Sequence, residues 1–330
     1  MRRIILEKIY DVAVIGGGSA GVMATLRSVL NNDETILFPG TGKDKKKSRA
    51  MWVTKVENMP GHLEYKKGIE NPNREQLDWL SKESDLKEKF VWQKNRGITE
   101  LKKEGSLFEL VDNKGDKYQA KYVILCTGVM DVQPKIDGDI APVFPYANNQ
   151  SIDYCLRCDG HHVYGKKTGI IGHTNGAGWV AAMLYERYQT PEMKIFTHGE
   201  TPEFDDEVKG LIDKYGIEVY EGEIFSIHGD TKSGKLEGFE VEGEGIVEVE
   251  MSFVSLGMIV YNELAKSLGA EVDERGFVVT NNKGETNIEN FYVAGDLRAG
   301  VKKQIYTAWD TAVDSADDIN AKIRRGRRNA

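Results

Sequence analysis

The sequence predicts an α/β protein with two related lobes, each built around a strand–helix–strand unit. In the first lobe, a buried-strand pattern at residues 10–15 runs through a glycine-rich turn into a helical segment at 22–30, and an apolar strand follows at 35–38. In the second lobe, a strand pattern at 168–171 precedes Gly172 and a helical segment through Arg187, and a strand follows at 193–196. Strands that alternate with helices in this way form parallel sheets with helices packed against them.

Domain boundaries are expected where these lobes meet other patterns. A strand at 121–126 is followed by Pro134, Gly138 and Pro142, which mark a linker. Near residue 250, a Glu-rich hairpin sequence gives way to an apolar stretch, and the chain ends with a strand at 291–294 and a helix from about Ile305. We expect residues 1–132 and 251–330 to form one discontinuous domain, with residues 133–250 as a central lobe between them.

Length and charge limit the classes of function. A chain of 330 residues with 40% hydrophobic content can bury the cores of two domains. Its formal net charge is −8. A general nucleic-acid binder would need a basic surface to neutralise phosphates, so nucleic acid is not an expected partner.

The N-terminal residues are expected to lead into the first strand. Arg2 and Arg3 precede a short apolar stretch that runs directly into the glycine-rich turn, with no small-residue cleavage site as in a signal peptide. No apolar run approaches the roughly 18 residues of a membrane span. We therefore expect a cytoplasmic protein without a membrane partner.

The first glycine-rich turn has the pattern of a dinucleotide-binding site. Gly16, Gly18 and Gly21 form GxGxxG between a strand and a helix, where backbone N–H groups and the helix N-terminus can contact a pyrophosphate. The alternative is a tight turn without a ligand. No Asp or Glu ends the following strand, where Phe38, Pro39 and Gly40 stand, so the usual ribose-binding carboxylate is missing or lies elsewhere. Because each lobe has a glycine turn between a strand and a helix, with a further strand after the helix, we expect both lobes to be Rossmann-like.

Cys155 and Cys158 form a CxxC motif that favours redox chemistry. Three cysteines in a chain of this length do not make a structural disulfide framework. Arg157, between the two thiols, would favour a reactive thiolate, and Asp159 is a candidate proton donor or acceptor for the thiol that leaves. These three residues, Cys155, Cys158 and Asp159, are the expected catalytic groups.

Zinc binding is the alternative role for this motif. His161 and His162 follow closely and could complete a Cys2His2 set. Structural zinc sites usually separate their two ligand pairs by a longer loop, so we favour the dithiol and expect no metal.

Five motifs, in order and at similar spacing across nearly the whole chain, resemble those of the low-molecular-weight thioredoxin reductases. They are the glycine turn 16–21, the segment 56–61, residues 126–128, the CxxC segment 155–160 and residues 293–296. The resemblance implies a homodimeric enzyme with an FAD domain formed by both chain ends and a middle lobe that carries the dithiol. In this arrangement Cys158 would face the flavin, and Cys155 would attack the substrate disulfide.

The resemblance also implies which residues bind FAD. The glycines of the first turn would hold the pyrophosphate, and Asn58 would lie by the isoalloxazine. Asp296 would bind the ribityl or phosphate region, and Gln304 would contact the flavin ring. The expected cofactor-binding residues are Gly16, Gly18, Ser19, Ala20, Gly21, Phe38, Pro39, Gly40, Arg49, Ala50, Asn58, Gly128, Gly295, Asp296, Lys303, Gln304, Ile305 and Trp309.

The second lobe departs from the NADPH site of that family. Thr174 replaces the glycine that lets the backbone approach a pyrophosphate, and Trp179 stands where NADPH-dependent members commonly have a carboxylate. Residues 197–200 replace the paired arginines that bind the 2′-phosphate, with His198 as one weak substitute. The sequence is thus more similar to the NADPH-independent branch, the ferredoxin-dependent flavin thioredoxin reductases and the di-flavin-linked disulfide oxidoreductases.

Three further features have two interpretations each. The basic segment 43–49 is either a solvated loop or a patch for an acidic protein donor or for additional phosphate. Trp309 either fills the core or covers the flavin. The arginine-rich tail, 324–328, is either a solvated end or a partner contact.

The leading functional prediction is an enzyme in which reduced FAD passes electrons to the Cys155–Cys158 disulfide and on to a thioredoxin-like protein. The expected donor is ferredoxin, flavodoxin or another source that is not NADPH. One alternative is a second FAD in the former NADPH region, with an unknown thiol partner. The other is a flavin-bound redox sensor without turnover.

Overall fold

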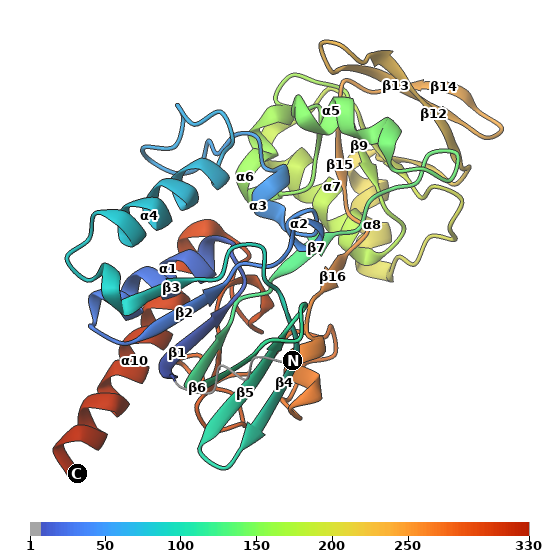
Figure 1. Cartoon of the computed structure of the whole chain (residues 1–330). Coiled ribbons are helices and arrows are strands. Elements are labelled where there is room, and N and C mark those ends of the chain that lie inside the picture. The colour runs from blue at the N-terminus through green and yellow to red at the C-terminus, as the bar shows by residue number, and fades with distance from the viewer. Residues whose placement is uncertain (1–7, 330) are drawn as a thin grey trace. The chain divides into compact units, whose positions relative to one another are not determined.

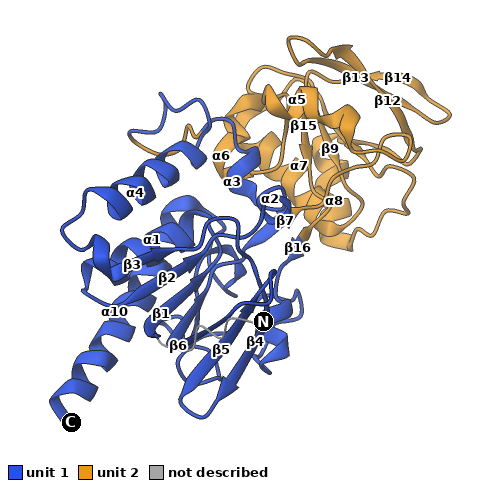
Figure 2. Cartoon of the chain, in the orientation of Figure 1, with its two compact units in different colours: residues 1–55, 61–130, 259–330 blue, residues 56–60, 131–258 orange. Residues whose placement is uncertain are grey.

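The computed structural model describes residues 8–329, which divide into two compact units (Figure 2). Unit 1 comprises residues 1–55, 61–130 and 259–330, and unit 2 comprises residues 56–60 and 131–258. The boundary that the sequence placed near residue 250 lies at 258/259 instead, because the strand at 251–254 pairs within the sheet of unit 2. The expectation that residues 1–7 lead into the first strand falls outside the described residues.

Unit 1 is built on a seven-stranded sheet (Figure 1). Its path runs β3 (Phe90–Trp92), β2 (Thr35–Phe38), β1 (Ile9–Ile15), β6 (Lys117–Leu125), β5 (Leu107–Asp112) and β4 (Ile98–Glu104), and β17 (Phe291–Val293) also pairs with β6. The strands β3, β2, β1, β6 and β17 are parallel, whereas β5 and β4 form an antiparallel extension. Parallel strands end at the same edge, so the turns after β1, β2 and β17 lie along one edge of the sheet.

Both faces of the parallel strands are buried. Val12 and Val14 of β1 pack against the helices α1 (Ser19–Leu30), α4 (Glu70–Lys82) and α10 (Ile305–Asn329), while Ala13 and Ile15 belong to a second apolar cluster on the other face. Successive residues of the strand face opposite sides of the sheet, and both sides are apolar. The strand is therefore a continuous apolar run in the sequence. The remaining short elements of unit 1 are α9 (Glu263–Ser267), η1 (Lys87–Lys89) and η4 (Gly295–Leu297).

The basic segment 43–49, for which a solvated loop was one of two interpretations, overlaps two short helices, α2 (Gly42–Lys45) and α3 (Arg49–Trp52). Thr41 caps α2 in a reciprocal arrangement with Asp44, and the hydroxyl of Ser48 accepts a hydrogen bond from the N–H of Ala50 at the start of α3. Lys45, Lys46 and Lys47 are exposed. The lysines therefore form a solvated surface held in place by two capped helical turns.

Unit 2 contains a five-stranded parallel sheet. Its order is β11 (Glu218–Tyr220), β10 (Met193–Phe196), β9 (Thr168–Ile171), β15 (Met251–Val254) and β8 (Ile152–Asp153). The Glu-rich region forms a three-stranded antiparallel sheet of β12 (Ile224–Asp230), β13 (Lys235–Val241) and β14 (Gly245–Glu248). The helices of the unit are α5 (Phe144–Asn148), α6 (Leu156–Asp159), α7 (Asn175–Tyr188), α8 (Asp206–Tyr215), η2 (Ala141–Val143) and η3 (Gly160–Val163).

Two short strands mark where the chain passes between the units. They are β7 (Val129–Asp131) and β16 (Met258–Val260), which pair in a two-stranded sheet. Among residues 8–329, no helix is long and apolar enough to cross a membrane. The α/β fold class with two βαβ lobes is confirmed.

Candidate active site

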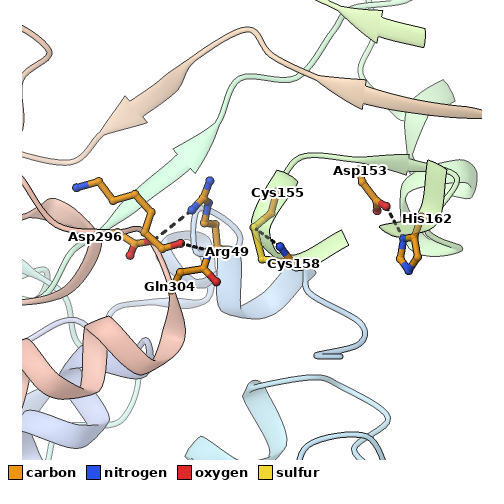
Figure 3. Close-up of a disulfide and its surroundings, with 8 residues drawn as sticks. Arg49, Asp153, Cys155, Cys158, His162, Asp296 and Gln304 are labelled. Atoms are coloured by element: carbon orange, nitrogen blue, oxygen red, sulfur yellow. Dashed lines mark hydrogen bonds and ion pairs between the residues drawn. A yellow bond between two sulfur atoms is a disulfide. The ribbon is translucent and has the colours of Figure 1, made fainter. Parts of the chain in front are cut away.

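Cys155 and Cys158 form a disulfide in unit 2 (Figure 3), with their Cα atoms 5.3 Å apart. Cys155 is the N-cap of α6, and its sulfur accepts a hydrogen bond from the N–H of Cys158 at 3.2 Å. This N–H would stabilise negative charge on the Cys155 sulfur once the disulfide is reduced. The bond between the two sulfurs also excludes the Cys2His2 zinc site for the chain in this oxidised state.

Asp159 lies beside the two sulfurs. A carboxylate oxygen of Asp159 and the two sulfurs all lie within 4.8 Å of one another. Burial raises the pKa of Asp159 to about 7, and the nearby carboxylate of Asp153 acts in the same direction. A carboxylic acid that titrates near neutral pH is suited to protonate a leaving thiolate and later to accept the proton back.

Two histidines that follow the dithiol in sequence form hydrogen bonds to a glutamate from a segment far away in the sequence. Nε2 of His161 lies 3.0 Å and Nε2 of His162 3.1 Å from the same Oε2 atom of Glu57, in residues 56–60 of unit 2. Nδ1 of His162 lies 2.8 Å from Oδ2 of Asp153 (Figure 3). The hydrogen bond to Asp153 raises the pKa of His162, and the hydrogen bond from His162 lowers that of Glu57. Sequence reasoning missed this cluster because Glu57 lies 104 residues from His161.

The glycine turn of unit 1 fits a pyrophosphate. A Cβ atom on Gly21 would lie 1.9 Å from the carbonyl oxygen of Gly16, and one on Gly16 would lie 2.2 Å from that of Cys126. By contrast, the nearest atom to a Cβ on Gly18 would be the Ser48 hydroxyl at 3.8 Å. The turn is thus packed tightly against its neighbours but has room at Gly18. No side chain caps the N-terminus of α1, so its backbone N–H groups remain for a ligand phosphate.

The carboxylate of Asp44 lies near the end of β2. In a usual dinucleotide site the carboxylate belongs to the last residue of this strand, which here is Phe38. Oδ2 of Asp44 accepts hydrogen bonds from the N–H of Thr41 at 2.8 Å and from the Thr41 hydroxyl at 2.7 Å. A Cβ on Gly40 would lie 2.9 Å from the Cβ of Asp44. The capping of α2 therefore folds Asp44 back over the strand end, which sequence spacing alone did not reveal.

Several other predicted cofactor residues gather in unit 1. Nη1 of Arg49 lies 3.3 Å from Oδ2 of Asp296 (Figure 3). Gly295 has φ +76°, and a Cβ there would lie 2.7 Å from that of Ala20, so η4 approaches the first turn of α1 closely. Lys303 donates to the carbonyl of Arg298 at 2.7 Å, and burial lowers its pKa to about 8.

The remaining predicted residues are divided between the two units. Gln304 is buried and immediately precedes α10, which begins at Ile305. Asn58 belongs to unit 2 with Glu57, whereas the other predicted cofactor residues belong to unit 1. Trp309, on α10, is partly exposed, and its ring centre lies 5.8 Å from that of His62. Both interpretations of Trp309 therefore stay predictions.

The turn after β9 in unit 2 carries the residues that depart from the expected NADPH site. Thr174 is the exposed N-cap of α7, and Trp179 is 40% exposed. Both ring nitrogens of His198 are engaged by the backbone, because Nε2 donates to the carbonyl of Lys135 at 2.9 Å and Nδ1 accepts from the N–H of Ile224 at 3.0 Å. The interpretation of His198 as a substitute phosphate ligand is thus unsupported by its contacts.

The third cysteine is separated from this chemistry. Cys126 follows β6 in unit 1 and is buried. Burial raises the pKa of its thiol to about 12, which leaves almost no thiolate at neutral pH. Cys126 is therefore poorly suited to act as a nucleophile.

Comparisons with known proteins agree with this arrangement. The chain is 26% identical to thioredoxin reductase from Mycoplasmopsis pulmonis over 97% of this chain and 99% of the relative. It is also 26% identical to thioredoxin reductase from Bacillus subtilis, over 92% of this chain and 91% of the relative.

Solved structures share the fold. Thioredoxin reductase from Giardia duodenalis superposes with a TM-score of 0.80 at 18% identity, over 96% of this chain and all of that one. The enzyme from Streptococcus pyogenes gives 0.76 at 19% identity, over 96% and 99%.

A family model covers most of the two units. Residues 10–316 match the pyridine nucleotide-disulphide oxidoreductases, a match that implies FAD and a thioredoxin reductase-like disulfide oxidoreductase. The match includes both the glycine turn of unit 1 and the disulfide of unit 2. The chain belongs to the pyridine nucleotide-disulphide oxidoreductase family.

Proposed function

We propose that the chain is a flavin-dependent thioredoxin reductase-like enzyme that reduces a thioredoxin-like protein through Cys155 and Cys158. The observation that carries this proposal is the disulfide at the start of α6, with Asp159 and its pKa of about 7 beside it. The full-length similarity to thioredoxin reductases supports a thioredoxin-like partner.

In the proposed reaction, bound FAD would supply the electron pair. The S–S bond between Cys155 and Cys158 takes up two electrons and two protons, and Asp159 holds one of these protons near the sulfurs. The Cys155 thiolate then attacks the partner disulfide, and the partner's leaving thiolate takes a proton from Asp159. Attack by Cys158 on the mixed disulfide releases the second partner thiol and restores the Cys155–Cys158 bond.

The proposed FAD site lies in unit 1. Gly18 and the first turn of α1 would hold the pyrophosphate, because this is the part of the turn with room for it. Arg49 and Asp296 would lie at the phosphate and ribityl region, and Gln304 would contact the ring. Asp44 is a further candidate for a ribose hydroxyl, because it supplies a carboxylate at the end of β2.

We further propose that the electron donor is ferredoxin or flavodoxin rather than NADPH. Residues 197–200, at the end of β10, supply no arginine for a 2′-phosphate, and their backbone lies beside Glu221 and Glu223: the N–H of Gly199 bonds the carbonyl of Glu221, and a Cβ on Gly199 would lie 3.6 Å from the Cβ of Glu223. Each lost charge-assisted contact to a phosphate costs about 1.5 to 3 kcal/mol, so losing two weakens binding by hundreds-fold or more. The exposed lysines at 45–47 offer a surface for an acidic donor protein.

The test is anaerobic reduction of the purified holoprotein by micromolar NADPH, NADH or reduced ferredoxin, followed by addition of oxidised thioredoxin. We expect the flavin absorbance to bleach with ferredoxin only, and thioredoxin to be reduced over many turnovers. Rapid bleaching by NADPH with multiple turnovers would overturn the donor proposal but retain the dithiol chemistry. A single reduction per dithiol, followed by no further turnover, would instead support the redox-sensor alternative.

A flavin count separates the remaining alternative. One FAD per chain agrees with direct transfer from a donor protein. Two FAD per chain would support the di-flavin form, with the second flavin in the former NADPH region near Thr174 and Trp179.

A further inference from the structure

The cluster of Glu57, His161 and His162 has the composition of a metal site. Nε2 of each imidazole and one carboxylate oxygen of Glu57 all lie within 4.8 Å of one another, and both nitrogens point at the same oxygen. His162 is largely buried, with 15% of its side chain exposed, whereas Glu57 and His161 are 28% and 52% exposed. The three groups thus converge in a partly enclosed place that solvent ions can reach.

We propose that Glu57, His161 and His162 bind a divalent transition-metal ion, with Zn²⁺ the best match. Two imidazoles and a carboxylate are ligands that zinc accepts, and three protein ligands leave a fourth position for water or a thiolate. With metal–ligand bonds of about 2.1 Å, two ligands of a tetrahedral ion lie about 3.4 Å apart. The nitrogen-to-oxygen distances of 3.0 and 3.1 Å need to open by only a few tenths of an ångström.

Asp153 supplies the supporting contact that such a site requires. Its Oδ2 atom lies 2.8 Å from Nδ1 of His162 (Figure 3), and the aspartate is 6% exposed. A metal ion would displace the proton that Nε2 shares with Glu57, and the carboxylate that accepts the Nδ1 proton would then hold the imidazole in the tautomer that coordinates through Nε2 and make it a stronger ligand. The Nε2 atom of His162 therefore faces Glu57 in the orientation that metal coordination uses.

Another histidine–glutamate pair in unit 2 shows what a plain ion pair looks like. Nε2 of His228 lies 3.4 Å from Oε2 of Glu240, and the hydroxyl of Ser226 is the third member of that group. Both His228 and Glu240 have at least 38% of their side chains exposed. This pair lacks a second imidazole and a buried carboxylate behind the first, so it serves as a matched control.

The site would link two parts of unit 2 that are distant in sequence. His161 and His162 lie in η3, directly after the CxxC helix, while Glu57 lies in the separate segment 56–60. A bound ion would fix this segment to η3. One of its ligands, His161, follows Cys158 by only three residues, so the open coordination position would belong to a site next to the CxxC helix in the sequence. The sequence predicted no metal, because the CxxC pair and the two histidines are too close together for a usual structural zinc site, and Glu57 lies 104 residues from His161.

The test is equilibrium dialysis of untagged, fully oxidised holoprotein against micromolar ZnCl2 with a weak competing chelator, followed by elemental analysis. We expect one zinc per chain in the parent protein and in His228→Gln. Glu57→Gln and His161→Gln should lose stoichiometric binding, and Asp153→Asn should bind 10- to 100-fold more weakly. Because Gln can still accept a hydrogen bond and His161 is exposed, both ligand variants should fold, which circular dichroism checks.

Three results would overturn the proposal. They are less than one zinc per chain in the parent at micromolar metal, binding unchanged in Glu57→Gln and His161→Gln, or binding lost equally in His228→Gln. X-ray absorption at the zinc edge should show only nitrogen and oxygen neighbours, and a sulfur neighbour would assign the metal to the dithiol instead. The assay measures binding to the oxidised protein, so its outcome does not depend on the proposed enzyme activity.

Discussion

The two glycines Gly18 and Gly21 should respond in opposite ways to the same added methyl group. An alanine at Gly18 adds a Cβ whose nearest atom is the Ser48 hydroxyl at 3.8 Å, an ordinary contact, and the residue has φ −78° and ψ −172°, which alanine adopts freely. We expect Gly18→Ala to leave the apoprotein as stable as the parent, or more stable by up to about 1 kcal/mol, since alanine restricts the unfolded chain.

FAD affinity should fall in Gly18→Ala, because the methyl group takes the space in which the pyrophosphate approaches the backbone. If one charge-assisted hydrogen bond is lost, the cost is about 1.5 to 3 kcal/mol. This corresponds to a dissociation constant raised about 10- to 150-fold. The measurement is titration of apoprotein with FAD, followed by quenching of flavin fluorescence.

Gly21→Ala tests the packing of the same turn. Its Cβ would lie 1.9 Å from the carbonyl oxygen of Gly16, over 1 Å inside contact distance, so the backbone must move. Such overpacking costs about 1 to 3 kcal/mol, and the better helix propensity of alanine returns up to about 1 kcal/mol. Thermal unfolding of the apoprotein should therefore show a lower midpoint for Gly21→Ala only. The reasoning is wrong if Gly18→Ala binds FAD like the parent, or if Gly21→Ala unfolds at the parent temperature.

Three further predictions concern the dithiol and the assembly. Cys155→Ser and Cys158→Ser should each abolish disulfide reduction but retain FAD, and Cys155→Ser should show a thiolate-to-flavin charge-transfer band; activity in either variant would contradict the dithiol mechanism. Because the raised pKa keeps Asp159 protonated below about pH 7, thioredoxin reduction should slow as pH rises through 7. Asp159→Asn should lose this inflection and about 100-fold or more in rate, and an unchanged pH profile would exclude Asp159 as the acid. From the resemblance to homodimeric enzymes, light scattering should give twice the 37.0 kDa chain mass, and a monomer at micromolar concentration would refute it.

Much of the fold followed from local patterns in the sequence. The strands at 35–38, 168–171 and 193–196 and the start of the final helix at Ile305 have the predicted bounds, because short apolar runs beside glycines leave little choice of element. The basic segment was harder to predict, since high charge resembles a solvated loop. Its two helices depend on side-chain caps from Thr41 and Ser48, which act over only three residues.

The candidate site was predictable only where its residues are close in sequence. Cys155, Cys158 and Asp159 are neighbours along the chain, so the motif indicated their meeting. Glu57 reaches His161 and His162 only through tertiary folding, and no spacing rule connects them. Likewise, nothing in the sequence shows that His198 uses both ring nitrogens in backbone hydrogen bonds.

The pairing of the chain's two ends within unit 1 has a consequence for how the protein is synthesised. The strand β17 lies beside β6, and the ion pair between Arg27 and Asp317, at 2.6 Å, joins residues 290 positions apart. While the ribosome is still making residues 259–330, β6 lacks this neighbour and α1 lacks its partner α10. Exposed strand edges and apolar helix faces favour aggregation, so we expect the nascent chain to be most prone to aggregation before residues 259–330 are made. Unit 2 ends at residue 258 and contains its whole parallel sheet, so it can fold before unit 1 is complete.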